Sequence, residues 1–340
     1  MKRKGNLVFV ILIMGLFLAF VAFAHAQEKV ITWKMAGVWG PGDMAYLPEG
    51  FAKMVTERSK GRLKVVTYPS GQLYGNQEIY GALQKGLVEL ADVATGWWGD
   101  TIPLYKFPDM PFFVRDNKEF KTLLDGGLMD LWQKEAQRNG FQTLTLYGMN
   151  GLTCFSISPV RTLEDAKGKK WRIHTPQLGQ AVKNIGASPV TIGMTEVYQA
   201  FERGVIDAGF MGVMPAYSYK WHEVAKYITK LDLAVPPMGV FANKKALDSL
   251  PPDLKDIVLK AGQEVTKMGW EAIDGFTKKK WDAFREEKCT VTIISDSERN
   301  RFIAASKASA IWAEEVKKMG PIGTQLLDTY YKVFPDRKPR

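Results

Sequence analysis

The sequence predicts an α/β protein folded into two lobes, and three observations support this fold class. Short β-branched runs alternate with longer amphipathic segments from Val30 onward, a pattern typical of α/β architecture. The 340 residues are enough to bury two hydrophobic cores. One helical pattern, at 252–287, would be about 50 Å long. Because this length exceeds one compact lobe, we expect the helix to span both.

The N-terminal segment has the features of a secretory signal peptide. Positive charges at Lys2, Arg3 and Lys4 precede an almost wholly apolar run, 7–23, and Ala24-His25-Ala26 forms a small-x-small cleavage pattern. An uncleaved membrane anchor is the alternative, because 17 apolar residues nearly span a bilayer. We expect residues 1–26 to be removed by cleavage after Ala26, and the mature protein to be exported and soluble.

The first half of the mature chain predicts four strands and three helices. A helix with Leu47, Phe51 and Val55 on one face ends at Gly61, which suits a left-handed cap. A second helix begins near Asn76 with Leu87 among its inward residues. The strands are expected at 30–36, 63–68, 90–95 and 141–147, and the third helix at 120–139.

The second half continues the alternation of strands and helices. Thr195 is expected to cap a helix that stops at Gly204. Within the long helix, glycines at 262, 269 and 275 are the weak points. The strands are expected at 152–158, 170–174, 205–210, 239–242 and 290–294, and the helices at 178–185, 195–203, 252–287 and 296–318. We place the lobe boundaries near Gly148–Gly151 and near Pro236-Pro237.

Charge and composition exclude some functions. Loss of the signal peptide lowers the formal net charge from +10 to +7, and the lysine clusters lie in helical patterns, which favours solvated helix faces. No zinc knuckle or helix-turn-helix pattern accompanies them, so we expect no nucleic-acid partner. The two cysteines, Cys154 and Cys289, either form a disulfide or remain buried thiols, and the sequence leaves both possibilities open.

Three segments resemble the solute-binding proteins of TRAP (tripartite ATP-independent periplasmic) transporters. The first, 68–78, is similar to the family's P-x-G-Q-L-G-x-x-x-E turn, and the second, 163–172, to its D-L-K-G-x-K-x-R strand entry. The third, 186–207, resembles its G-A-S-P-V…E-V-Y-x-A-L-x-x-G-V-V-D run. The segment 243–252 before the long helix also fits. The likeness covers essentially the whole mature chain.

This resemblance implies a periplasmic-binding-protein-like clamp of two lobes that closes on one ligand. The implied lobes are 27–150 with about 237–275, and 151–236 with about 276–320, followed by a tail or helix at 321–340. The implied function is capture of a small organic acid in the periplasm and delivery to membrane permease subunits. We expect a monomer, with a dimer as the alternative.

The resemblance places Arg172 on the ligand carboxylate, since it matches the last arginine of the strand-entry motif. A guanidinium suits this role because its paired donors match a carboxylate and it stays charged at physiological pH. A surface arginine in a basic patch is the alternative. Trp39, Trp97 and Trp98 follow predicted strands, where α/β proteins place ligand contacts. His174 lies two residues past Arg172 and would share its strand face, either to assist binding or as a structural histidine. Met194 and Glu78 are the remaining ligand-binding candidates.

Departures from the family pattern indicate the kind of ligand. Many members carry G-Q-E-N-P after G-V-V-D, and their asparagine bonds the ligand. Here Phe210 and Met211 replace polar residues of that motif, and the segment 152–158 lacks an arginine that members often carry. We therefore expect a monocarboxylate or oxo acid with an apolar tail, rather than a short dicarboxylate or a sugar acid.

Two other classes of function remain as alternatives: an exported sensory ligand-binding protein and an exported enzyme. The sequence contains no H-E-x-x-H, paired-cysteine cluster or G-x-S-x-G motif, and a Cys154–His174 nucleophile pair has no supporting signature. We expect no catalytic residues, no cofactor and no metal ligands, although a metal ion that assists ligand binding, as in some related members, is not excluded.

Overall fold

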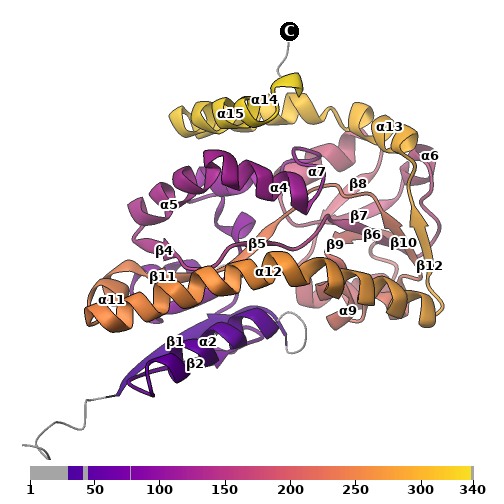
Figure 1. The fold of residues 1–340 in the computed structure, drawn as a ribbon. Coiled ribbons are helices and arrows are strands. Elements are labelled where there is room, and N and C mark those ends of the chain that lie inside the picture. Colours follow the sequence, from indigo (N-terminus) through magenta and orange to yellow (C-terminus); the bar gives the residue numbers. More distant parts are fainter. Residues whose placement is uncertain (1–29, 41–44, 77, 338–340) are drawn as a thin grey trace, which may run out of the picture.

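The structure contains two six-stranded sheets, one in each lobe (Figure 1). It is a computed structural model that describes residues 30–40, 45–76 and 78–337. In the first sheet the order is β2 (Leu63–Tyr68), β1 (Ile31–Gly37), β3 (Leu90–Ala94), β11 (Pro237–Asn243) and β4 (Phe141–Thr143), and β5 (Tyr147–Gly148) also pairs with β11. In the second the order is β12 (Thr290–Ile293), β10 (Tyr227–Lys230), β6 (Thr153–Ser156), β9 (Ala208–Met211), β7 (Lys170–Ile173) and β8 (Ser188–Thr191). The predicted two-lobed α/β class is confirmed.

Short helices surround each sheet. The first lobe contains α2 (Tyr46–Arg58), α3 (Ile79–Gln84), α4 (Asn117–Leu123), α5 (Met129–Arg138) and α11 (Lys244–Asp248), with the 3₁₀ turns η1 (Thr95–Trp98) and η2 (Pro103–Asp109) and the π turn η3 (Leu124–Leu128). The second contains α6 (Leu163–Ala166), α7 (Pro176–Asn184), α8 (Val197–Glu202), α9 (Val213–Ser218), α10 (Trp221–Val224) and α13 (Asp296–Ser306), with the 3₁₀ turn η4 (Met194–Glu196). Near the C-terminus follow α14 (Ala308–Met319), α15 (Pro321–Val333) and η5 (Pro335–Arg337).

The long helix α12 (Pro252–Glu286) spans both lobes, as predicted (Figure 1). It packs on α2 and β5 of the first lobe and on α9 and β12 of the second. Two of its glycines permit close packing. A β-carbon added to Gly262 would lie 2.4 Å from the carbonyl oxygen of Leu144, and one added to Gly269 would lie 2.7 Å from Cγ of Tyr147. The glycines therefore let the helix backbone approach the first lobe.

The chain passes from the first sheet to the second between β5 and β6, and it returns between β10 and β11. The two crossing segments, 149–152 and 233–236, run side by side and share backbone hydrogen bonds. The N–H of Met149 donates to the carbonyl of Pro236 at 3.2 Å, and that of Leu152 to Ala234 at 2.8 Å. These crossing segments form the floor between the lobes.

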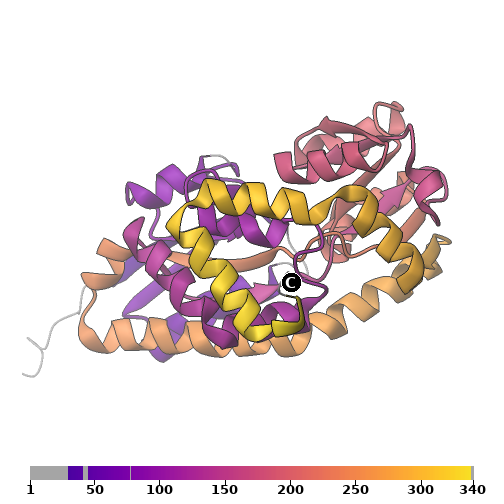
Figure 2. The same ribbon diagram turned by 90° about the horizontal axis from the view of Figure 1, so that it is seen from above.

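Helices α14 and α15 return over the first lobe on the side away from α12 (Figures 1 and 2). The indole N–H of Trp312 donates to the carbonyl of Pro111 at 2.7 Å, and the hydroxyl of Tyr330 donates to that of Phe113 at 3.0 Å. Helix α14 also contacts α7 of the second lobe. The C-terminal helices therefore provide a further connection between the lobes.

Several predicted elements are interrupted or shorter than expected. The helix predicted at 120–139 is kinked at Gly127, where φ is 119°, and the helix at 296–318 is broken at Lys307, whose φ is 54°. The strand at 141–147 is split because both Leu144 and Thr145 bond the carbonyl of Val240. Leu87, predicted to face inward, is 48% exposed because α3 ends at Gln84.

The predicted cap at Thr195 is also wrong. Gly193 precedes the helical segment, and its N–H donates to the carboxylate of Glu196. Several short elements were not predicted, because four to six residues are too few to show a hydrophobic period. They are β8, β10, α6, α9, α10 and α11.

Both cysteines are free and buried, which decides between the two possibilities that the sequence left open. No helix within the described ranges is long and apolar enough to cross a membrane. The predicted signal peptide lies outside those ranges.

Candidate functional site

A cavity lies between the two lobes, above the crossing segments, where several strands of both sheets end. It encloses about 360 Å³, its open mouth included. Most of its lining residues follow β1, β3, β7, β8 or lie at the end of β9, and the others come from η2 and the crossing segments. The lining residues are Trp39, Ala94, Trp97, Asp109, Met149, Leu152, Arg172, His174, Met194, Met211 and Pro236. The site thus occupies the carboxyl ends of strands, where α/β proteins bind ligands.

Arg172 provides the cavity's buried guanidinium. It lies on β7 and is only 4% exposed. Its Nε donates to the carbonyl of Ile192 at 3.1 Å, and its guanidinium carbon lies 5.9 Å from the centre of the Trp221 ring. Within the described part of the chain, its terminal nitrogens have no hydrogen-bond or ion-pair partner. Burial lowers the pKa of Arg172 to about 10, so the side chain remains charged at neutral pH.

Strand alternation directs Arg172 into the cavity. Successive side chains on a strand point to opposite faces of the sheet, so Arg172 and His174 share the cavity face while Trp171 points into the core of the second lobe. Gly209 pairs with Arg172 in the neighbouring strand β9. A side chain on Gly209 would lie against the arginine, so the bare backbone leaves the guanidinium its room.

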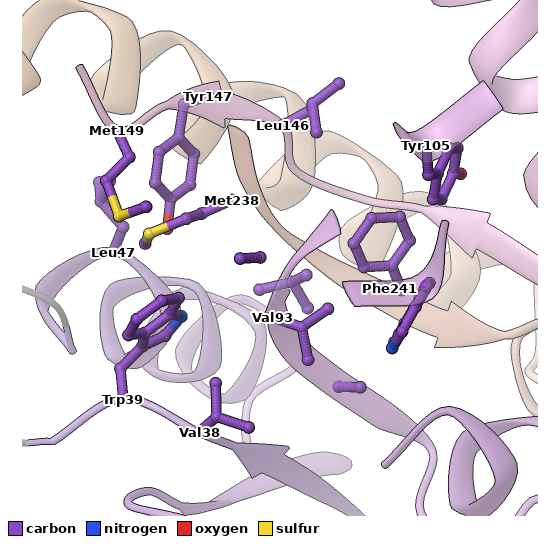
Figure 3. Packing of buried hydrophobic residues seen from close by; sticks show 14 of the residues in the cluster. Val38, Trp39, Leu47, Val93, Tyr105, Leu146, Tyr147, Met149, Met238 and Phe241 are labelled. Carbon is purple, nitrogen blue, oxygen red and sulfur yellow. The ribbon is translucent and has the colours of Figure 1, made fainter. Parts of the chain in front are cut away.

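Two tryptophans form an aromatic wall on the first lobe. The ring centres of Trp39 and Trp97 are 5.4 Å apart, and the rings are tilted by 31°. Figure 3 shows that the ring of Trp39 faces the side chains of Met149 and Met238. Met149 lines the cavity from the first crossing segment, whereas Met238 belongs to the adjoining core. The cavity is largely apolar because its lining includes Trp39, Trp97 and Met149, together with Met194 and Met211 of the second lobe.

Asp109 and His174 are the other ionisable side chains among the lining residues. The Nε2 atom of His174 lies 3.5 Å from Oδ1 of Asp109. Asp109, at the end of η2, is 1% exposed. Neither Oδ1 of Asp109 nor Nδ1 of His174 has a hydrogen-bond partner among the described residues. The cavity therefore holds polar atoms that a bound molecule could satisfy.

Arg172 and His174 also line a second, more polar cavity, which we call the vestibule. It shares Trp97 and Met194 with the first cavity and adds polar side chains such as Lys106. Its further polar residues are Asn76, Asp100, Thr175, Gln177 and Thr191. Because Arg172 lines both spaces, it stands where the polar vestibule meets the apolar cavity.

The structure brings six of the nine predicted site residues together, namely Arg172, Trp39, Trp97, His174, Met194 and Met211. The other three lie away from the cavity, which corrects the prediction for them. Trp98 is 2% exposed and packs against Phe241 in the core of the first lobe. Phe210 packs against Trp171, because neighbouring strand residues point to opposite faces. Glu78 is exposed, and its carboxylate accepts the N–H of Gly75 at 2.8 Å.

Five lining residues were not predicted from the sequence: Ala94, Asp109, Met149, Leu152 and Pro236. Ala94 immediately precedes the Thr95–Trp98 turn, and Met149, Leu152 and Pro236 lie at the predicted lobe boundaries, so their positions gave a usable signal. No sequence pattern indicated Asp109, because it lies in an irregular segment whose position depends on tertiary contacts.

Comparison with known proteins places the chain in a family. The model for bacterial extracellular solute-binding protein family 7, DctP, matches residues 36–318. The chain is 28% identical over 288 residues to the 2,3-diketo-L-gulonate-binding periplasmic protein YiaO of Escherichia coli K12, covering 84% of this chain and 82% of that protein. It is 27% identical over 219 residues to the C4-dicarboxylate-binding periplasmic protein DctP of Rhodobacter capsulatus, covering 64% and 66% respectively.

Solved structures show the same fold. The Bordetella pertussis receptor DctP7, which binds pyroglutamic acid, superposes with a TM-score of 0.81 at 25% identity, covering 88% of this chain and 99% of that one. A TRAP solute-binding protein from Desulfovibrio salexigens with bound orotic acid gives 0.82 at 22% identity, covering 90% and 99%.

A two-lobed fold with a ligand-sized cavity and a buried arginine between the lobes is typical of an extracytoplasmic solute receptor. The chain belongs to family 7 of the bacterial extracellular solute-binding proteins, and it is a TRAP-type solute receptor. It is a transport protein and not an enzyme. The chemistry of Cys154 agrees, because burial raises the pKa of its thiol to about 12, the opposite of an activated nucleophile.

Proposed function

We propose that the protein captures a small monocarboxylate with an apolar body, oxo acids included, and delivers it to the membrane permease of a TRAP transporter. Arg172 binds the carboxylate, and the aromatic wall and the methionines enclose the rest of the molecule. The observation that carries this proposal is the buried guanidinium of Arg172, whose terminal nitrogens have no partner within the described ranges.

An anionic ligand would offset the cost of that burial. A charge taken out of water destabilises a protein unless it is paired. A carboxylate fits the guanidinium through two parallel hydrogen bonds, each contributing about 1.5–3 kcal/mol. Two such bonds account for a large part of a micromolar affinity, roughly 8 kcal/mol.

The rest of the lining favours one carboxylate and an apolar body. Trp39, Trp97, Met149, Met194 and Met211 offer carbon and sulfur surfaces that match a branched or cyclic skeleton. A second carboxylate on the ligand would meet the carboxylate of Asp109, and like charges at short range repel. Pyroglutamic acid, which the DctP7 receptor binds, is an acid of this small size.

Capture and release require the lobes to separate and close. We take the lobes as 27–150 with about 237–275, and 151–236 with about 276–320, so that the crossing segments serve as the hinge. A ligand that contacts both lobes binds the closed form more tightly and so drives closure. We further propose that the mature protein begins at Gln27 and acts as a monomer, which intact-mass measurement and analytical ultracentrifugation of the exported protein would check.

A thermal-shift screen of organic acids tests the proposal. The exported protein, its Arg172→Met variant and an Arg203→Met control, which removes an exposed arginine of the same lobe, are screened against monocarboxylates, oxo acids, dicarboxylates and sugar acids. We expect branched or cyclic monocarboxylates to raise the melting temperature of the wild type and of the control only. Equal binding by Arg172→Met would remove Arg172 from the site, and tighter binding of succinate or malate would overturn the proposed ligand class.

A further inference from the structure

The carboxylate of Asp109 is held in the cavity by its surroundings. A β-carbon added to Gly96 would lie 1.8 Å from Oδ2 of Asp109, so the carboxylate rests directly on the bare backbone of η1. The carbonyl of the preceding residue, Pro108, accepts the N–H of Val235 from the second crossing segment at 3.2 Å. Backbone contacts on two sides therefore fix the position of Asp109 at the floor of the cavity.

No described residue donates a hydrogen bond to this fixed carboxylate, although Nε2 of His174 lies 3.5 Å from its Oδ1. Its Oδ1 is buried and has no hydrogen-bond partner among the residues that the structure describes, and the same holds for Nδ1 of His174. An ionised carboxylate can only accept hydrogen bonds. A buried acceptor left without a donor destabilises the protein, so such groups are normally satisfied or serve a function.

Arg172 and the pair formed by Asp109 and His174 border the same cavity. His174 lies two residues beyond Arg172, and its Nε2 is 3.5 Å from Oδ1 of Asp109. Because all three side chains line one cavity, a single small molecule bound there can contact both the guanidinium and the pair.

We infer that Asp109, with His174 beside it, is the second polar contact of the ligand site, and that it selects carboxylates carrying a hydrogen-bond donor such as a hydroxyl or a ring N–H. This inference rests on the proposed function, in which Arg172 holds the ligand's carboxylate. Asp109 accepts the hydrogen bond, and His174 holds the Asp109 carboxylate from the second lobe. A ligand that joins Arg172 to Asp109 connects the second lobe to η2 of the first lobe and so favours the closed form.

The same arrangement discriminates among acids of equal shape. The hydroxyl of a hydroxy acid donates a hydrogen bond to the carboxylate of Asp109. The corresponding oxo acid presents a carbonyl oxygen, which is an acceptor, and therefore forms no hydrogen bond with that carboxylate. The unsubstituted acid leaves Asp109 without a partner. A site that hydrogen-bonds a ligand's donor rejects analogues that lack it much more strongly than an apolar pocket rejects a missing methyl group.

Calorimetric titration with matched acids tests this inference without any substitution. The probes are isovalerate with its 2-hydroxy, 3-hydroxy and 2-oxo derivatives, and pyroglutamate with cyclopentanecarboxylate. We expect at least one hydroxy or N–H acid to bind about ten- to a hundredfold more tightly than its unsubstituted partner. If no donor-bearing acid binds more tightly than its parent, or if the oxo acid binds most tightly, the inference is wrong.

Two variants assign the preference to Asp109. Asp109→Asn keeps the shape of the side chain but replaces one acceptor oxygen with a donor group, and Gly96→Ala leaves Asp109 in the chain but displaces its carboxylate. Both should lower the ratio of the affinities for the donor-bearing acid and the unsubstituted acid towards one. An unchanged preference in both would overturn the inference.

The outcomes also separate this inference from the proposed function. Binding of acids that depends on Arg172 but shows no donor preference would overturn the inference and leave the proposed function standing. If no acid binds to the wild type, the proposed function fails and this inference fails with it. If one variant does not fold, the other variant and the ratios of affinities measured for the wild type still test the inference.

Discussion

Gly209 lies beside Arg172 in adjacent parallel strands, and a β-carbon on Gly209 would be 3.3 Å from Cβ of the arginine. The same carbon would lie 3.5 Å from the ring of Trp221, which lies under the guanidinium. The missing side chain at position 209 thus leaves the space in which Arg172 is oriented towards the cavity.

Gly209→Val should therefore weaken ligand binding. The added branched side chain would push Arg172 and Trp221 apart, and a misplaced guanidinium would lose at least one of the two hydrogen bonds that we propose it makes with the ligand's carboxylate. We expect the dissociation constant of the tightest acid to rise about tenfold or more, measured by calorimetry. Circular dichroism checks that the fold is kept, and affinity unchanged in a folded variant would show that Arg172 has room to adjust.

Arg172→Met should stabilise the protein when no ligand is present. Burial lowers the pKa of Arg172 from 12.5 to about 10, so below pH 10 the native state holds a charge that the unfolded chain would hold at less cost. A shift of this size corresponds to about 3 kcal/mol of destabilisation at neutral pH. We expect part of this to be recovered as a higher denaturation midpoint in urea. Arg203→Met, at an exposed site, is the control and should change little. A lower midpoint in Arg172→Met would mean that the arginine mainly supports the fold.

Asp92 should make stability depend on pH. It is buried on β3, its Oδ1 has no hydrogen-bond partner within the described chain, and burial raises its pKa from 3.8 to about 8. Because the native state binds this proton more tightly than the unfolded state, the contribution is fully present below about pH 3.8 and is lost as the pH rises to about 8. The loss reaches about 1.4 kcal/mol per pH unit within that window.

Melting curves between pH 5 and pH 9 check this expectation. The melting temperature of Asp92→Asn should fall less with rising pH than that of the wild type. Asp328→Asn, which removes an exposed aspartate, should keep the wild-type slope. Parallel curves for Asp92→Asn and the wild type would show that Asp92 does not take up a proton on folding.

Two glycines of α12 should respond to alanine in opposite directions. A β-carbon at Gly269 would lie 2.7 Å from the Tyr147 ring, whereas one at Gly275 would meet no atom within 4 Å. We expect Gly269→Ala to destabilise the protein by about 1–3 kcal/mol, and Gly275→Ala to stabilise it by up to about 1 kcal/mol. Urea denaturation of the matched pair measures both. Equal effects would mean that α12 shifts freely over the first lobe.

The long periodic segments could be predicted from the sequence. The face to which a single side chain points could be predicted only for some residues. Ten apolar residues at helical spacing identified α12, which ends one residue before the predicted Glu287. Neighbouring residues of a strand point to opposite faces, so Phe210 and Met211 cannot both face the cavity. The sequence pattern was therefore enough to exclude one of them. For Trp97 and Trp98 the local pattern gave no direction, because they lie in a 3₁₀ turn whose orientation depends on the core of the first lobe.

Asp109 shows what the sequence could not provide. Its approach to His174 depends on η2 resting on η1 and on the second crossing segment, which lies more than a hundred residues later in the chain. The resemblance to the family pointed to Arg172, but the position of Asp109 beside His174, on which we base the proposed ligand preference, follows only from the packing of both lobes.

Neither lobe is continuous in the sequence, and this affects how the chain folds. In the first lobe, strand β3 pairs with β11, and five of the six strands of the second sheet lie between them in the sequence. In the second lobe, the remaining strand, β12, follows α12. Pairings between such distant segments form slowly. A chain that ends before β11 would leave the edges of β3 and β4 without a partner, and such edges promote aggregation. The protein therefore becomes resistant to proteolysis and aggregation only when nearly all of it has been synthesised, and we expect truncated products to be degraded rather than to persist as half-receptors.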